Sequence, residues 1–159
     1  MSARLLPLLH PSRVLVGAQE PDKAAVLDRA LRLAATSDTV RDADVLRQDV
    51  LAREETMSTG VGQGLAFPHA RTDAVGATVV SLLTLAEPVE FGSLDGAPVR
   101  IVLLLAGPSD ERTAHVRLLG RASRLFADDA TRNAVQTATS VDAVIDTLQA
   151  AEQALDARS

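Results

Sequence analysis

The chain has 159 residues, a formal net charge of −5 and an aromatic content of 2%. Its length suits one domain with a sizeable core, and its acidic balance leaves neither a basic stripe nor a stacking platform for nucleic acid. The lack of cysteine excludes disulfides, thiolate metal sites and a catalytic thiol. No apolar run approaches the roughly 18 residues that cross a bilayer, so we expect a cytoplasmic protein that is not membrane-embedded.

The first third of the chain predicts a short lead, one strand and two helices. A leucine-rich lead over 1–9 precedes a brief strand over 13–17. Asp22 is suited to cap the first helix, and a second helix over 42–55 would deliver Arg53 to the rim of a glycine-rich loop. The apolar residues of both helices follow the 3.6-residue period: Val26, Leu27, Ala30, Leu31 and Ala34 in the first, and Val45, Leu46, Val50 and Leu51 in the second.

The next stretch combines a glycine-rich loop, a short apolar run and a histidine. The alternating glycines of 60–64 permit backbone conformations that are closed to residues with a Cβ. The apolar run over 65–67 suits a buried strand, and Pro68 favours an extended residue before it. His69 is therefore expected where this strand stops. An imidazole with a reference pKa of about 6.5 has a free lone pair at neutral pH, which makes it a nucleophile or a base.

Arginines stand at both edges of this stretch, and Arg53 and Arg71 would suit a phosphate or carboxylate that approaches the ring of His69. Two nucleotide-binding motifs do not fit. The glycines are spaced G-x-G-x-G, with Leu65 where a dinucleotide fingerprint needs its third glycine, and no Gly-Lys-Ser/Thr comes after them, as a P-loop requires. From residue type alone, a loop histidine that caps a strand end is an equally good interpretation of His69.

The second half of the chain predicts two central strands followed by helices. Near-continuous apolar runs over 77–85 and 99–106 indicate strands covered on both faces, joined by a turn-rich connection over 87–98. Ser109 is suited to cap a helix that runs to about 125, and further helices are expected over 128–138 and from Ser140 onward. The polar tail over 151–159 is expected to fray. Helices around buried strands predict an α/β layered fold.

A second histidine lies in the first of these late helices. His115 precedes Leu118 and Leu119 by three and four residues, so its side chain should face the sheet. On the residues alone, a half-buried helix histidine bonded to a backbone carbonyl is the favoured interpretation. A metal site formed by His69 and His115 would lack a third strong ligand at a recognisable spacing, so no metal or other cofactor is expected. His10 has no chemical role that its surroundings suggest.

The run from Arg53 to Arg71, with R-E-E, S-T-G-V-G-Q-G and A-F-P-H-A-R, resembles the signature of type 2 enzyme IIA domains. These domains form the fructose, mannitol and nitrogen-regulatory group of the bacterial phosphoenolpyruvate-dependent sugar phosphotransferase system (PTS). The resemblance extends over nearly the whole chain. It implies a single IIA domain over 1–159, with a central mixed sheet flanked by helices on both faces in three layers.

The resemblance also implies site roles. His69 would carry a phosphoryl group on its tele nitrogen, Nε2, and His115 would support it from a His-x-x-x-Leu-Leu type helix. Physically, a neighbouring imidazole N–H can hold the tautomer of His69 or donate to a phosphoryl oxygen. Arg53, the hydroxyl of Thr59 and the backbone around Thr59 and Gly60 are the expected phosphate-binding groups. Whether Arg71 contacts phosphate stays open, because the corresponding family position varies.

The function implied is a phosphoryl relay. Phosphocarrier protein HPr, charged by phosphoenolpyruvate through enzyme I, would phosphorylate His69, and the group would pass to a IIB component for fructose- or mannitol-type sugar uptake. Family partners usually accept it on a cysteine; since this chain has none, the acceptor must be another chain. The alternative is a nitrogen-regulatory IIA that signals by phosphorylation-dependent protein binding. A two-histidine phosphate-ester hydrolase lacks a visible carboxylate triad or nucleophilic serine motif. The sequence does not identify the sugar.

Overall fold

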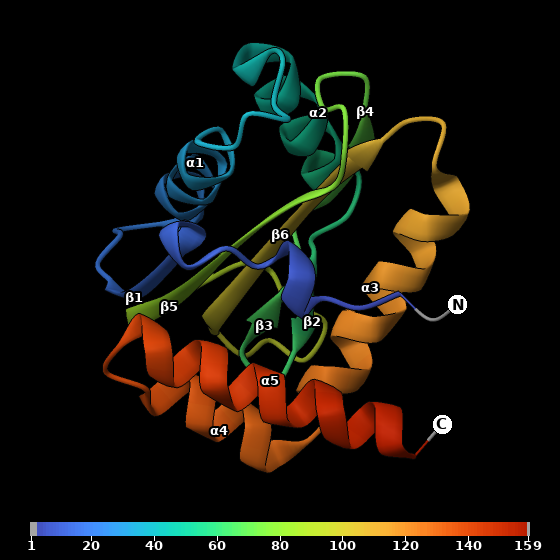
Figure 1. The fold of residues 1–159 in the computed structure, drawn as a ribbon. Helices are drawn as coiled ribbons and strands as arrows, with labels where there is room; N and C mark the ends of the chain where they lie inside the picture. Colours follow the sequence, from blue (N-terminus) through green and yellow to red (C-terminus); the bar gives the residue numbers. More distant parts are fainter. Residues whose placement is uncertain (1–2, 159) are drawn as a thin grey trace.

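The computed structural model describes residues 3–158; Met1, Ser2 and Ser159, the ends of the predicted lead and tail, lie outside the described residues. Within this range a six-stranded mixed sheet lies between two layers of helices (Figure 1). Helices α1 (Lys23–Ala34) and α2 (Ala43–Thr56) cover one face. Helices α3 (Arg112–Phe126), α4 (Asp129–Thr137) and α5 (Val141–Ala157) cover the other. The predicted three-layer α/β fold is confirmed.

The sheet is organised around one long antiparallel pair, β5 (Val79–Val89) and β6 (Val99–Pro108). On the outer edge of β5, β1 (Val14–Ala18) runs parallel to it. On the other edge of β6, β3 (Leu65–Ala66) and β4 (His69–Thr72) come one after the other, both parallel to β6. The strand β2 (Gly60–Gly62) closes this edge by pairing antiparallel with β3.

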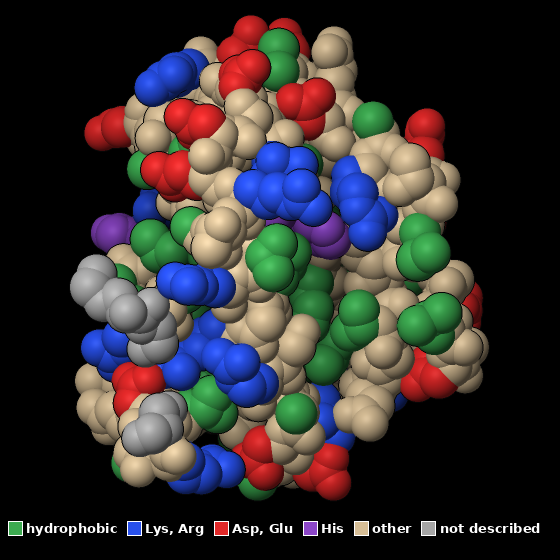
Figure 2. Space-filling model, turned by 90° about the vertical axis from the view of Figure 1, so that its right-hand side faces the viewer, with side chains coloured by type: hydrophobic (Ala, Val, Ile, Leu, Met, Phe, Trp, Pro, Cys, Tyr) green, Lys and Arg blue, Asp and Glu red, His purple; other side chains and the backbone are tan. Residues whose placement is uncertain are grey.

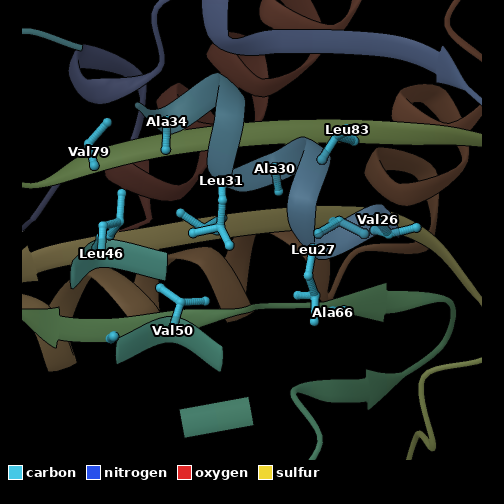
Figure 3. Close-up of a cluster of buried hydrophobic side chains, with 14 of the residues drawn as sticks. Val26, Leu27, Ala30, Leu31, Ala34, Leu46, Val50, Ala66, Val79 and Leu83 are labelled. Atoms are coloured by element: carbon cyan, nitrogen blue, oxygen red, sulfur yellow. The ribbon is translucent and has the colours of Figure 1, made fainter. Parts of the chain in front are cut away.

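Both faces of the central pair are buried, as the apolar runs predict. Along β6 the side chains alternate between the two helical layers, with Val102 and Leu104 toward α1 and α2, and Leu103 and Leu105 toward α3 and α5. Figure 3 shows part of the first core, in which the inner stripes of α1 and α2 pack on the sheet. Its labelled residues are Val26, Leu27, Ala30, Leu31, Ala34, Leu46, Val50, Ala66, Val79 and Leu83.

Of the two predicted helix caps, Asp22 is confirmed and Ser109 is wrong, and Ser140, predicted to start a helix, also caps it. The side chains of Asp22 and Ser140 accept hydrogen bonds from backbone amides in the first turns of α1 and α5. Ser109 does not cap α3, because β6 continues to Pro108 and the helix begins only at Arg112. The hydroxyl of Ser109 donates instead to Asp73, in the turn after β4.

The predicted frayed tail is wrong for most of its length. Helix α5 continues to Ala157, and Glu152 within it is fully buried. Its carboxylate pairs with Arg121 of α3 at 2.9 Å and accepts hydrogen bonds from the backbone amides of Leu5 and Leu6, at 2.8 and 2.9 Å. This buried ion pair therefore fastens both the tail and the N-terminal lead to α3. In residues 3–158, no helix is long and apolar enough to cross a membrane.

Candidate functional site

His69 lies where the edge of the sheet is interrupted. Leu65 lies opposite Ile101 in β6, and His69 lies opposite Leu105, so the parallel register is the same before and after the break at Pro68. His69 is thus the first residue of β4 and not the last residue of a strand, as the sequence suggested. The physical reason is that pairing with β6 resumes immediately after the proline, whose carbonyl accepts from the amide of Leu105.

The ring of His69 is held by its own backbone. Nδ1 lies 2.8 Å from the carbonyl oxygen of Phe67. Because a carbonyl only accepts hydrogen bonds, Nδ1 must be the protonated nitrogen, and in the neutral ring Nε2 carries the free lone pair. In the neutral ring, the hydrogen bond to Phe67 therefore leaves Nε2 as the nitrogen that could act as a nucleophile.

His115 approaches from α3 on the same side of the sheet. The two ring centroids are 5.6 Å apart, with the ring planes at 47°. His115 is only 5% exposed, and neither of its ring nitrogens has a hydrogen-bond partner within residues 3–158. The prediction that His115 faces the sheet is confirmed, whereas the expected bond to a backbone carbonyl does not form. A buried imidazole without a partner is a costly arrangement that a third group would relieve.

Two arginines from different elements also line the site. Arg53, in the last turn of α2, donates from Nη1 to the carbonyl of Met57 at 3.1 Å. Arg71, in β4, donates from Nη1 to the carbonyl of Ser109 at 3.1 Å. Since a backbone carbonyl engages only part of each five-donor guanidinium, both retain donors for an anion.

Together these groups line a pocket of about 510 Å³. Figure 2 shows this face of the molecule, where histidine atoms lie beside basic side chains in its middle part and hydrophobic side chains extend below them. The pocket is lined by Asp49, Ala52, Arg53, His69, Ala70, Arg71, Thr72, Asp73, Ser109, His115, Val116 and Leu119.

The two carboxylates of the pocket are occupied by hydroxyl groups. Thr72 donates to Asp49 at 2.6 Å, and Ser109 donates to Asp73. These bonds stabilise the loop and strand ends around the pocket. The sequence did not predict that these four residues line the pocket, because their contacts join segments that are distant in the chain, and Ser109 was predicted only as a helix cap.

Both histidines of the pocket are neutral at physiological pH. Burial is the main cause that lowers the pKa of His69, and the charge of Arg53 acts in the same direction, while the carbonyl of Phe67 and the charge of Glu54 oppose it. Burial also lowers the pKa of His115 to about 4, with smaller contributions from His69 and Arg71. The site thus presents an uncharged nucleophile, an uncharged imidazole donor and two guanidinium groups, which suits an incoming phosphoryl group.

The structure does not bring Thr59 and Gly60 into the wall of this pocket. Thr59 is buried, and its hydroxyl and amide donate to the two carboxylate oxygens of Glu54, at 2.5 and 2.8 Å. The amide of Gly60 donates to the hydroxyl of Ser58 at 3.1 Å. Gly60 instead allows close packing, because a Cβ there would lie 2.3 Å from the hydroxyl of Ser93. Their predicted phosphate-binding role has no contact that supports it in this conformation.

Glu54 is the functional candidate that the sequence reasoning passed over. It is 6% exposed and forms an ion pair with Lys23, the only lysine of the chain, at 2.8 Å. A signal was present: Leu46, Val50 and Glu54 continue one stripe at four-residue intervals, which puts the carboxylate on the inner face of α2. Among residues 3–158, no group of three or more histidine and acidic side chains could hold a metal ion.

Comparison with known proteins establishes the family. The model of the "Phosphoenolpyruvate-dependent sugar phosphotransferase system, EIIA 2" family matches residues 7–151. The chain therefore belongs to this family of PTS EIIA domains, as the motif around His69 indicated.

The curated relatives include both nitrogen regulatory proteins and sugar-specific PTS components. The chain is 32% identical to the nitrogen regulatory protein of Pseudomonas aeruginosa, over 89% of this chain and 92% of that protein. It is 31% identical to the PTS system fructose-specific EIIA component of Haloferax volcanii, over 84% of this chain and 88% of that protein. Among solved structures, the nitrogen regulatory protein IIA-Ntr of Neisseria meningitidis matches with a TM-score of 0.84 and 26% identity, covering 90% of this chain and 97% of that one.

Proposed function

We propose that the chain is a PTS phosphocarrier in which Nε2 of His69 accepts a phosphoryl group from phosphorylated HPr and passes it to a separate IIB component. The observation that carries the proposal is the bond from Nδ1 of His69 to the carbonyl of Phe67. It leaves Nε2 as the only nucleophilic ring nitrogen of His69, in a pocket that also holds Arg53, Arg71 and His115.

Transfer at this site needs no proton to leave His69. The bond between phosphorus and the donor histidine of HPr breaks as the bond between phosphorus and Nε2 forms. The proton remains on Nδ1, hydrogen-bonded to the carbonyl of Phe67. Phosphoryl transfer depends mainly on positioning and on stabilising charge at the equatorial oxygens. Holding the tautomer in advance therefore removes one step that would otherwise precede the reaction.

The surrounding side chains supply the charge stabilisation. Arg53 and Arg71 bring positive charge to the pocket, and each keeps donors that its backbone carbonyl partner does not use. His115 is neutral and without a partner within residues 3–158, so its N–H is available to donate. Because the arriving phosphoryl group is an anion, it also favours a proton on His115.

Regulation by phosphorylation-dependent protein binding is the second candidate. The 32% identity to a nitrogen regulatory protein over 92% of its length favours it. Both candidates require phosphorylation of His69, and they differ in the next step. In the first, the phosphoryl group is delivered to a IIB component of a fructose- or mannitol-type permease; in the second, a target protein recognises the phosphorylation state.

The test is mass spectrometry of the protein and its peptides after incubation with phosphoenolpyruvate, enzyme I and HPr, under alkaline conditions that preserve phosphohistidine. We expect one phosphate on the peptide that contains His69, and none when HPr is omitted. An unmodified protein, under conditions that charge a control IIA, would overturn the proposal. Mixing the charged protein with a fructose- or mannitol-type IIB then separates the two candidates, since only the first predicts rapid loss of phosphate to it.

A further inference from the structure

We propose that Glu54 is a positioning residue for His69. Its buried carboxylate fixes Thr59, and Thr59 holds the backbone amide of Phe67, the residue whose own carbonyl sets the orientation and tautomer of the His69 ring. This inference deepens the proposed function and rests on it for the role of His69.

Glu54 is fully engaged by groups from two other parts of the fold. Its Oε2 lies 2.8 Å from Nζ of Lys23, in the first turn of α1, and 2.8 Å from the amide of Thr59. Its Oε1 lies 2.5 Å from the hydroxyl of Thr59. Phe91 also holds Lys23 in place. The Nζ of Lys23 donates to the backbone carbonyl of Phe91 at 3.2 Å and lies 5.1 Å from the centre of the Phe91 ring. The carboxylate thus ties α1, α2 and the start of the glycine-rich loop together.

The hydrogen bonds continue from Thr59 to the site. The carbonyl of Thr59 accepts from the amide of Phe67 at 3.0 Å, and the carbonyl of Phe67 faces Nδ1 of His69 at 2.8 Å. An unbroken path therefore leads from Lys23 through Glu54, Thr59 and Phe67 to the ring of His69. The hydrogen bonds of this path are directional, and the backbones of Thr59 and Phe67 join them covalently, so we expect a displacement at Thr59 to move the carbonyl that orients the ring.

The charge of Glu54 is essential to this arrangement. Burial opposes its ionisation, but Lys23 and the two donors of Thr59 outweigh burial and lower the pKa of Glu54 below its ordinary value. Hydrogen bonds to an ionised carboxylate are shorter and stronger than those between neutral groups. A neutral amide in its place could still accept from the amide of Thr59 and donate to its hydroxyl, but these bonds would lose their charge and Lys23 would lose its ionised partner. Glu54 is also the direct neighbour of Arg53 in α2, so it fixes the helix turn that carries a guanidinium to the pocket.

Glu54→Gln tests the assignment because it keeps the size of the side chain and removes its charge. The readout is the nitrogen-15 NMR spectrum of the histidine rings, which reports the protonated nitrogen of His69 directly. In the wild type we expect the proton on Nδ1. In Glu54→Gln we expect a mixture in which Nε2 gains protonation, together with a loss of about tenfold or more in the rate of phosphorylation by HPr. Lys23→Met should shift the tautomer in the same direction, and Lys23→Arg should restore it.

The matched control is Glu152→Gln at the other buried carboxylate. Glu152 has the same chemistry, an ion pair with Arg121 and two backbone amides, but its partners lead to the N-terminal lead and not to His69. We expect Glu152→Gln to lower the melting temperature and leave the His69 spectrum unchanged. The proposal is overturned if Glu54→Gln leaves the spectrum of His69 unchanged, or if Glu152→Gln alters it as much.

Two further arms keep the test decisive. If Glu54→Gln does not fold, Lys23→Met and Thr59→Val decide on the same spectrum, and an unchanged Nδ1 proton in both contradicts the proposal. The spectrum needs no phosphoryl donor, so it separates the two claims. A wild type that HPr cannot charge would refute the proposed function, whereas the tautomer of its His69 would still show whether Glu54 positions the ring.

Discussion

The start of β4 and the first turns of α3 each contribute a histidine to one pocket, but within the described part of the chain only the histidine of β4 has a hydrogen-bonded ring. His69 is half-buried and bonded through Nδ1 to the carbonyl of Phe67. His115 is 5% exposed, and neither nitrogen has a partner within residues 3–158. A strand that restarts after a proline places a carbonyl beside the ring, whereas the carbonyls inside a helix are used by the helix itself.

This difference between the two histidines favours the roles that we propose for them. A ring whose tautomer is fixed in advance suits a nucleophile, because one nitrogen is always ready to attack. A neutral ring with no hydrogen-bond partner suits a donor to an arriving phosphoryl group, because it has no existing hydrogen bond to break. We therefore expect substitutions around the pocket to differ in size of effect, with the largest at His69 and the smallest at Arg53.

Replacing His69 should have the largest effect on phosphorylation. We expect His69→Ala to abolish phosphorylation by HPr, because it removes the nucleophile that the pocket holds ready. His10→Ala is the matched control, since His10 is exposed and bonded only to Ser12 nearby. Mass spectrometry under alkaline conditions measures both, and phosphate retained by His69→Ala would contradict the assignment of the acceptor.

Replacing His115 should slow onward phosphoryl transfer without stopping it. We expect His115→Ala to leave His69 chargeable but to slow onward transfer about 100-fold, the scale typical for loss of one preorganised donor at a transition state. Rapid-quench measurements of phosphate loss to a IIB acceptor provide the rate. Complete loss of charging, equal to that of His69→Ala, would show that the roles are divided wrongly.

Acid should destabilise the fold through His115. Its pKa is about 4 in the folded protein against an ordinary value of 6.5. The unfolded chain therefore binds this proton more tightly, so the contribution to stability is complete above pH 6.5 and is lost as the pH falls toward 4. The loss is roughly 3 kcal/mol. Urea unfolding of the wild type and His115→Asn across this range measures it: the wild type should show the steeper decline, and equal slopes would contradict the burial of a neutral ring.

The smallest of these effects is expected at Arg53. Its guanidinium already donates to Met57 and Thr56 at the end of α2. A new hydrogen bond to phosphate would partly replace these bonds, so the net stabilisation from Arg53 is smaller. We expect Arg53→Met to slow phosphorylation about tenfold, less than a fully committed donor would. The charging rate by HPr at several salt concentrations measures it. The control is Arg29→Met, which breaks the ion pair between Arg29 of α1 and Glu20 and should leave the rate unchanged.

Much of the fold could be predicted because its helices and strands repeat simple patterns. The inner stripe of α1 and the caps at Asp22 and Ser140 are local features, and local physics decides them. The pairing of His69 with His115 was less accessible. Periodicity puts His115 on the inner face of α3, but only the register of β4 on β6 shows which strand residue it meets. The family resemblance supplied what the residues alone left open.

Two of the misjudgements, at Glu54 and at the C-terminal tail, share one cause: a charged side chain was assumed to lie outside. Glu54 extends the stripe of Leu46 and Val50 in α2, and Glu152 extends that of Val144 and Leu148 in α5. Both carboxylates are buried because a cation from another helix and hydrogen-bond donors from another segment meet them there. Such partners are non-local, so the sequence could not show them. The same oversight led to the prediction that the end of α5 would be a frayed tail.

The central claim is that Nε2 of His69 receives the phosphoryl group, and the most direct measurement is NMR of the phosphorylated protein labelled with nitrogen-15. Coupling between phosphorus and the ring nitrogens identifies the bonded atom. The arrangement of the pocket predicts phosphorus on Nε2 of His69, with the proton still on Nδ1 beside the carbonyl of Phe67. Phosphorus on Nδ1, or on either nitrogen of His115, would contradict it.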